Sequence, residues 1–205
     1  MKTAARQHIP VLTLVAMLVG WICSVPAIQA DQAKAGSGAI RLERIAAGDK
    51  GGQAYRLVYH VNVPPAVFWK FKTDFDNEFV TDNRYIREHH FIQRIGNEVI
   101  TENKYTSGPD VFFRWRTRVF PGEHRLAFTL LNPQQCNQDF HYGTIWIEPE
   151  NGGTRVTQET FFDFWGATFW AHNPWKGGMK DFLTYTARWE QETALRLLHR
   201  YRDVK

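Results

Sequence analysis

Strict alternation between apolar and polar residues in several segments constrains the fold of this chain more than any other feature. The first such segment, residues 53–63, places Tyr55, Leu57, Tyr59 and Val61 on one face. Six further segments, separated by turn signals, are predicted strands: residues 84–92, 98–106, 112–120, 125–132, 142–149 and 154–164. A period of two with one polar face is typical of antiparallel strands, and Asn151-Gly152 fits a tight hairpin turn. We therefore expect an antiparallel sheet of about seven strands.

Two helices complete the predicted order of elements. Pro64-Pro65 ends the first strand and suits a first helical turn, and apolar residues at helical spacing follow up to Phe75. Residues 179–202 predict a second, long helix that begins after Gly177-Gly178. The order strand, short helix, six strands, long C-terminal helix indicates an α+β fold.

The first thirty residues have the pattern of a secretory signal peptide. Lys2 and Arg6 precede an apolar run at 11–25, and Ala30 closes the segment. A retained membrane anchor is the alternative, although the run is short for a span. We expect an exported protein, periplasmic in a Gram-negative host and otherwise secreted. Residues 31–52 would be a loose leader, and 53–205 a single domain.

Charge and motifs exclude several classes of function. The formal net charge is +4, and two of these charges, Lys2 and Arg6, lie in the predicted signal peptide. No Lys/Arg block indicates a nucleic-acid partner. Cys136 would be the only cysteine of the mature chain, so no internal disulfide can form there. The histidines lack metal-ligand spacings, and no phosphate-binding glycine loop or nucleophile elbow occurs. We expect neither a metal nor a cofactor.

The two faces of the predicted sheet differ in character. One carries Arg114, Arg116 and Arg118, which favours a solvated face with cross-strand partners such as Glu102; an anion-binding face is the alternative. The opposite face is mostly apolar but includes polar residues. A packed core would be drier, because an unpaired buried polar group costs about 1–3 kcal/mol. This face therefore predicts a hydrated or ligand-filled cavity, unless its polar positions lie at the ends of the sheet.

Glu190 stands within the apolar stripe of the long helix, between Leu183 and Leu197. A carboxylate there must be paired or protonated, which makes it a candidate site residue. A Glu at the sheet edge that reaches water or bridges to an arginine is the structural alternative.

Residues 164–178, FWGATFWAHNPWKGG, join the last strand to the long helix. Gly166 and Pro174 prevent a regular element there, so its aromatic residues cannot all be strand core. We expect an aromatic rim over a cavity. Contact with a membrane, or a plug formed by Phe169, Trp170 and Trp175 turned inward, is the alternative.

Three stretches together resemble the START-like, SRPBCC superfamily, which includes polyketide cyclases, coenzyme-Q-binding proteins and lipid-transfer domains. They are the proline-initiated helix with TDFDN at 73–77, GGTRVTQETFFD at 152–163, and GGMKDFLTYTARWEQE at 177–192. The resemblance implies a helix-grip fold, in which a curved antiparallel sheet wraps a long C-terminal helix around an apolar cavity. It also implies that residues 165–178 form the cavity mouth and that Trp189 and Glu190 face inward.

The leading hypothesis is an exported protein that binds a hydrophobic or amphipathic molecule: a lipid, a quinone or an aromatic metabolite. The strand residues expected at the ligand are Tyr59, Asn103, Tyr105, Trp115, Gln158, Thr160 and Phe162. Those expected from the loop and long helix are Trp170, Trp175, Phe182, Trp189 and Glu190. One alternative is an enzyme of the cyclase, dehydratase or hydrolase type with Glu190 as acid or base, for which the sequence offers no positive argument. Another is a module that contacts a membrane or a partner through the 165–178 loop.

Overall fold

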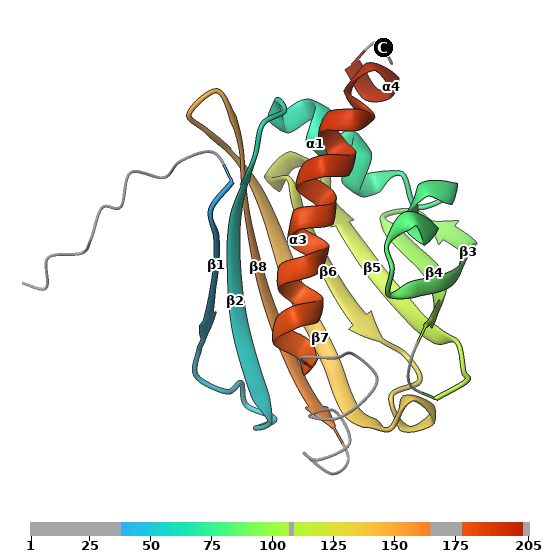
Figure 1. Ribbon diagram of the computed structural model, residues 1–205. Coiled ribbons are helices and arrows are strands. Elements are labelled where there is room, and N and C mark those ends of the chain that lie inside the picture. The colour runs from blue at the N-terminus through green and yellow to red at the C-terminus, as the bar shows by residue number, and fades with distance from the viewer. Residues whose placement is uncertain (1–37, 107–108, 165–177, 203–205) are drawn as a thin grey trace, which may run out of the picture. The chain divides into compact units, whose positions relative to one another are not determined.

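The computed structural model describes residues 38–106, 109–164 and 178–202, which form one antiparallel sheet with helices packed on it (Figure 1). The strand order is β1-β2-β8-β7-β6-β5-β4-β3. Their bounds are β1 Ile40–Arg44, β2 Gln53–Val61, β3 Ile86–Ile95, β4 Glu98–Tyr105, β5 Phe113–Phe120, β6 Arg125–Leu130, β7 Gln138–Glu150 and β8 Gly153–Phe164. The helices are α1 Pro65–Thr73, α3 Gly178–Arg196 and α4 Leu198–Arg202, with short 3-10 turns η1 Glu78–Asp82, η2 Pro121–Glu123 and η3 Gln134–Cys136.

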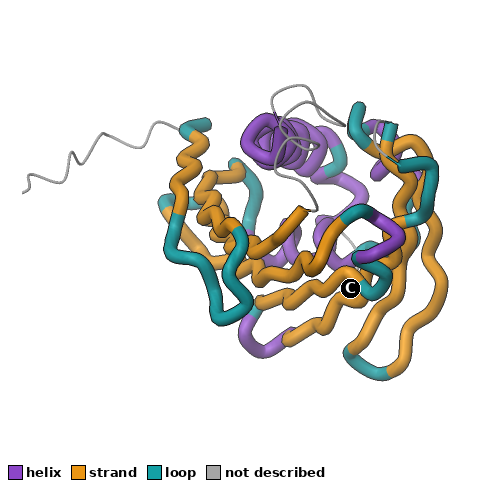
Figure 2. Tube along the Cα trace, turned by 90° about the horizontal axis from the view of Figure 1, so that it is seen from below, coloured by secondary structure: helices purple, strands orange, loops and turns teal. Residues whose placement is uncertain are grey.

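The sheet curves, and α3 lies along its concave side (Figures 1 and 2). The buried residues of α3 recur at helical spacing and include Met179, Leu183, Ala187 and Glu190. α3 packs most closely on β2 and β1, at one end of the strand order. This is the predicted helix-grip arrangement, and the predicted fold class is confirmed.

The sheet has one strand more than the expected seven, and the extra strand corrects the N-terminal boundary. β1 lies at 40–44, inside the segment expected to be a loose leader, and pairs with β2 through Ile40↔Tyr59 and Leu42↔Leu57. Five residues of alternation next to a small, polar stretch are too few to stand out in the sequence. Hydrogen bonding to the edge of β2 supplies what the local pattern lacks. The short helix α1 consequently follows the second strand.

Two smaller predictions about the sheet hold. Asn151 and Gly152 both have positive φ, 47° and 78°, and connect β7 directly to β8. On the outer face, Arg114 pairs with Glu102 at 2.6 Å and Arg118 with Glu98 at 2.6 Å. The arginine ladder is therefore a solvated face with cross-strand partners.

The long C-terminal helix is divided in two at Leu197, where a single helix over 179–202 was expected. The buried Tyr201 of α4 donates a hydrogen bond to Asp74 Oδ2 at 2.6 Å, next to the C-terminal end of α1. This tertiary contact, which the local sequence cannot encode, directs the last turn toward α1.

We predict that Gly143→Ala destabilises the fold by about 1–3 kcal/mol, the usual cost of overpacking. Gly143 lies in β7, and an added Cβ would collide with the backbone oxygen of Glu159 and the ring of Phe128. Urea unfolding measures the loss. Gly122→Ala is the matched control, since no atom lies within 4 Å of its Cβ position. Equal stability of the two variants would contradict the prediction.

Candidate functional site

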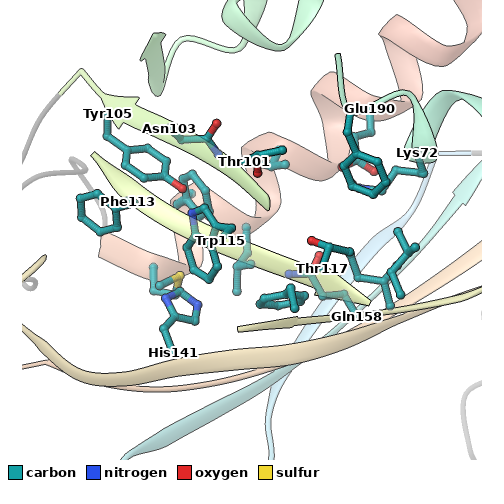
Figure 3. Close-up of a pocket in the computed structure, with 18 of the residues that line it drawn as sticks. Lys72, Thr101, Asn103, Tyr105, Phe113, Trp115, Thr117, His141, Gln158 and Glu190 are labelled. Atoms are coloured by element: carbon teal, nitrogen blue, oxygen red, sulfur yellow. The ribbon is translucent and has the colours of Figure 1, made fainter. Parts of the chain in front are cut away.

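A cavity of about 240 Å³ lies between α3 and the inner face of β4 to β8 (Figure 3). Strand alternation and the spacing of α3 aim these side chains inward. Its apolar wall consists of Phe75, Phe113, Trp115, Leu126, Phe128, Ile145, Met179, Phe182 and Leu183. Its polar groups are Lys72, Thr101, Asn103, Tyr105, Thr117, Gln138, His141, Gln158, Thr186 and Glu190. The inner face thus combines the apolar wall and scattered polar groups that the alternation predicted.

Glu190 forms the charged end of this cavity. It is only 4% exposed, and its Oε1 accepts a hydrogen bond from Lys72 Nζ at 2.6 Å. Its Oε2 accepts a hydrogen bond from the Tyr59 hydroxyl. Burial and the adjacent carboxylate raise the pKa of Tyr59 well above its usual value, so the phenol keeps its proton and donates. The expectation that Glu190 is paired is confirmed, and its partner is a lysine of α1.

His141 forms a neutral end of the cavity with Gln138 and Thr160. Its Nδ1 lies 3.1 Å from Gln138 Oε1, and its Nε2 lies 3.0 Å from Thr160 Oγ1. Burial lowers the pKa of His141 to about 3, so the ring is uncharged at neutral pH. Because Gln138 Oε1 can only accept, Nδ1 carries the ring proton and Nε2 accepts from Thr160. The Trp115 ring meets His141 edge-on, with centroids 4.9 Å apart.

Tyr105 and Asn103 complete the wall on β4 (Figure 3). Burial raises the pKa of Tyr105 to about 12, and the phenol is therefore neutral. The Oδ1 atom of Asn103 lies 2.6 Å from His89 Nδ1, and His89 Nε2 lies 2.8 Å from the backbone oxygen of Phe75. His89 thereby fixes both the amide of Asn103 and the segment after α1 at the cavity.

The structure brings half of the predicted ligand-binding residues to the cavity: Asn103, Tyr105, Trp115, Gln158, Phe182 and Glu190. Three others support the wall from behind. Tyr59 holds Glu190, Thr160 holds His141, and Phe162 packs between Tyr55 and His141.

The expectation that Trp189 faces the main cavity is wrong. Its ring packs with Phe71 and Phe79, and it borders a smaller cavity of about 100 Å³ beside α1. The reason is helical geometry: consecutive residues point about 100° apart, so Trp189 and Glu190 do not share a direction. Trp170 and Trp175, with the rest of the predicted 165–178 rim up to residue 177, lie outside the described residues.

Lys72, Gln138 and His141 were not predicted. Lys72 lies near the end of a short helix with no acidic residue in it, and only the approach of α3 gives it a buried partner. Gln138 and His141 were missed because the strand was expected to begin at residue 142, whereas β7 begins at 138. Ile145 faces the cavity, and side chains four positions apart on a strand point to the same face. Extending the predicted strand back to His141 would therefore have placed its side chain on the cavity side.

Within the described ranges, no group of three or more His, Cys, Asp or Glu side chains could hold a metal ion. In that same part of the chain, none of the helices is both long and apolar enough to span a membrane.

No protein-family profile matches the sequence, and no curated protein matches it. Solved structures match at the level of fold. The human StAR-related lipid transfer protein 5 aligns with a TM-score of 0.54 and 14% identity, covering 80% of this chain and 85% of that one. A STAR-related lipid transfer protein from Xanthomonas axonopodis aligns with a TM-score of 0.53 and 11% identity, covering 78% and 93%. The Zhui aromatase/cyclase from a Streptomyces strain aligns with a TM-score of 0.52 and 10% identity, covering 78% and 96%.

These similarities show the fold of the chain. The chain has the same helix-grip fold as these lipid-transfer and aromatase/cyclase structures, and the sequence resemblance implied this fold. At this level of identity the similarity concerns the fold, and the function has to be argued from the cavity.

We predict that Lys72→Met destabilises the protein by about 3–5 kcal/mol, because it leaves the buried Glu190 carboxylate without its positive partner. The double variant Lys72→Met/Glu190→Gln should recover part of that loss, since the glutamine amide would be neutral and could still accept from Tyr59. Urea unfolding of the single and double variants measures both effects. The exposed pair Arg196–Asp82, 2.7 Å apart, is the control, and Arg196→Met should have a much smaller effect. Additive losses in the double variant would contradict this account of the pair.

We predict that His141 makes the fold less stable in acid. Its pKa in the folded chain is about 3, against about 6.5 in an unfolded chain. Between these values the unfolded chain binds a proton that the folded chain does not. The free energy of unfolding therefore decreases by about 1.4 kcal/mol for each pH unit by which the pH is lowered. Urea unfolding at pH 4 to 7 should show a shallower slope in His141→Gln. The slope should not change in the control His199→Gln, which alters an exposed residue of α4. Identical slopes in wild type and His141→Gln would refute the assignment.

Proposed function

We propose that this protein binds one hydrophobic or amphipathic small molecule in the cavity between α3 and β4 to β8. The cavity itself is the observation that carries the proposal. Most of its surface is apolar, although about half of the lining residues carry a hydrogen-bonding group, and these groups stand at defined places within it. Mostly apolar, pre-formed hollows with a small number of polar groups are typical of small-molecule sites.

The size of the cavity favours a compact ligand. Its volume of about 240 Å³ is several times the ~30 Å³ that a water molecule occupies in the liquid. It is slightly below the roughly 300–1,000 Å³ typical of sites for drug-sized molecules. A fused ring system or a single acyl chain fits this size better than a two-chain lipid. Two of the proteins with similar folds are named as lipid transfer proteins, which supports a hydrophobic ligand.

The cavity chemistry favours binding over the acid–base role considered for Glu190. Both carboxylate oxygens of Glu190 already accept hydrogen bonds, from Lys72 and from Tyr59. These contacts fix the position of the carboxylate, as expected for an orienting group. His141 has a pKa of about 3, which makes it a weak base at neutral pH. We therefore propose that the polar groups orient a ligand and that no reaction is carried out on it.

The proposed protein acts after export. This part of the proposal rests on the pattern of residues 1–30, and it places the protein in the periplasm of a Gram-negative host or outside the cell. A ligand with low solubility in water would need a carrier in either compartment.

Native mass spectrometry of the protein, freshly purified from the exported fraction, tests the proposal. We expect the mass of a chain beginning at Asp31, together with a bound hydrophobic molecule. A bound fluorescent fatty acid should be displaced by that molecule after extraction. If no ligand co-purifies and no ligand displaces the fluorescent fatty acid, the result counts against the binding function. An intact N-terminus would count against export.

A matched pair of variants localises the binding. Thr117→Phe should weaken binding of the fluorescent fatty acid at least tenfold, because Thr117 lines the cavity and a ring there would fill it. Thr157→Phe makes the same change on the outer face of β8, where Thr157 pairs with Val58 and Trp146, and should leave binding intact. Equal binding by the two variants would place the ligand elsewhere.

A further inference from the structure

The neutral end of the cavity contains two hydrogen-bond donors that have no acceptor among the described residues. They are Nε2 of Gln138 and Nε1 of Trp115, both buried atoms of residues that line the cavity. The Gln138 side chain is fully buried, with 0% of the residue exposed. Buried donors are almost always paired in folded proteins, and each exception requires an explanation.

The two donors belong to one group of side chains. Gln138 Oε1 contacts His141 Nδ1 at 3.1 Å, and the Trp115 ring packs against the same histidine. The His141 contact uses the oxygen of the amide and leaves its NH₂ group unused. The Trp115 indole lies beside the Tyr105 hydroxyl, close enough to favour its ionised form, but no well-directed acceptor faces Trp115 Nε1 (Figure 3). Both donors are therefore held in place, and neither is satisfied.

The groups around these donors are uncharged. Tyr105 keeps its phenol proton, since burial raises its pKa to about 12, and His141 is neutral, with a pKa of about 3. The charged pair Lys72–Glu190 lies at the other end of the cavity (Figure 3). A carboxylate at the neutral end would be a buried charge without a counter-ion, which is strongly unfavourable. A neutral acceptor would instead satisfy the donors and bring no charge with it.

We infer that Gln138 and Trp115 form a subsite for a neutral carbonyl oxygen, and that the ligand is a compact ketone, ester or quinone. This inference rests on the proposed function and specifies its ligand class. The carbonyl oxygen has two lone pairs and can accept from the Gln138 amide and the Trp115 indole together. The apolar remainder of the ligand lies against the surrounding aromatic wall.

The experiment compares two probes of the same shape, 2-acetylnaphthalene and 2-isopropenylnaphthalene, which differ by a C=O in place of a C=CH₂. We expect the wild-type protein to bind the ketone about tenfold more tightly, an advantage that corresponds to about 1.4 kcal/mol. Gln138→Leu should lose this preference while it still binds the alkene. Thr157→Val, which removes a hydroxyl on the outer face of β8, should retain the preference.

The outcomes separate the inference from the proposed function. Equal affinities for the two probes in the wild-type protein would overturn the carbonyl subsite and leave the binding function in place. Binding of neither probe, up to its solubility limit, would contradict both. A preference that survives in Gln138→Leu would overturn the role of Gln138, and binding of the alkene shows that this variant is folded.

A measurement on the unaltered protein avoids dependence on any variant. The infrared C=O stretch of the ¹³C-labelled ketone should move to lower frequency on binding, relative to the ketone in cyclohexane, because hydrogen bonds weaken the C=O bond. An unshifted band would overturn the inference, since it would show that the bound carbonyl accepts no hydrogen bond.

Discussion

The contact on which the arrangement most depends is the buried group formed by Glu190, Lys72 and Tyr59. Its three members come from α3, α1 and β2, and the two donors share the carboxylate. A buried carboxylate without partners would be strongly destabilising, so each of these elements is held at a fixed position relative to the other two. α3 thereby packs on the β1–β2 side of the sheet, and the space toward β4 to β7 remains as the cavity.

The cavity is polarised as a result. One end has an ion pair whose charges compensate each other, and the other has only neutral groups centred on His141. The aromatic and aliphatic wall lies between them. An amphipathic ligand can be oriented in such a site by matching its polar groups to the two ends. This division of charge is the basis both of the proposed binding function and of the carbonyl subsite.

Much of the fold could be predicted because its information is local. Alternation in the strands depends on side chains pointing to opposite faces at successive residues, and it located the strands from residue 53 onward. It also separated the arginine face from the cavity face, so that Asn103, Tyr105, Trp115 and Gln158 were correctly placed on the cavity wall. The strand β1 was missed because its five residues gain their structure from pairing with β2, a contact distant in sequence.

The sequence by itself determined the two faces of the sheet, the position of Glu190 on the apolar stripe of its helix, and the need for that carboxylate to be compensated. Only the tertiary structure decided what compensates it. Lys72 lies 118 positions away in the chain, and nothing in the local pattern of α1 distinguishes it from Lys70. The same holds for Gln138 and Trp115, whose unpaired donors become visible only when β5 and β7 meet around His141. Periodicity is a property of neighbouring residues and can be read from sequence, whereas pairing across the fold depends on where distant elements come to lie.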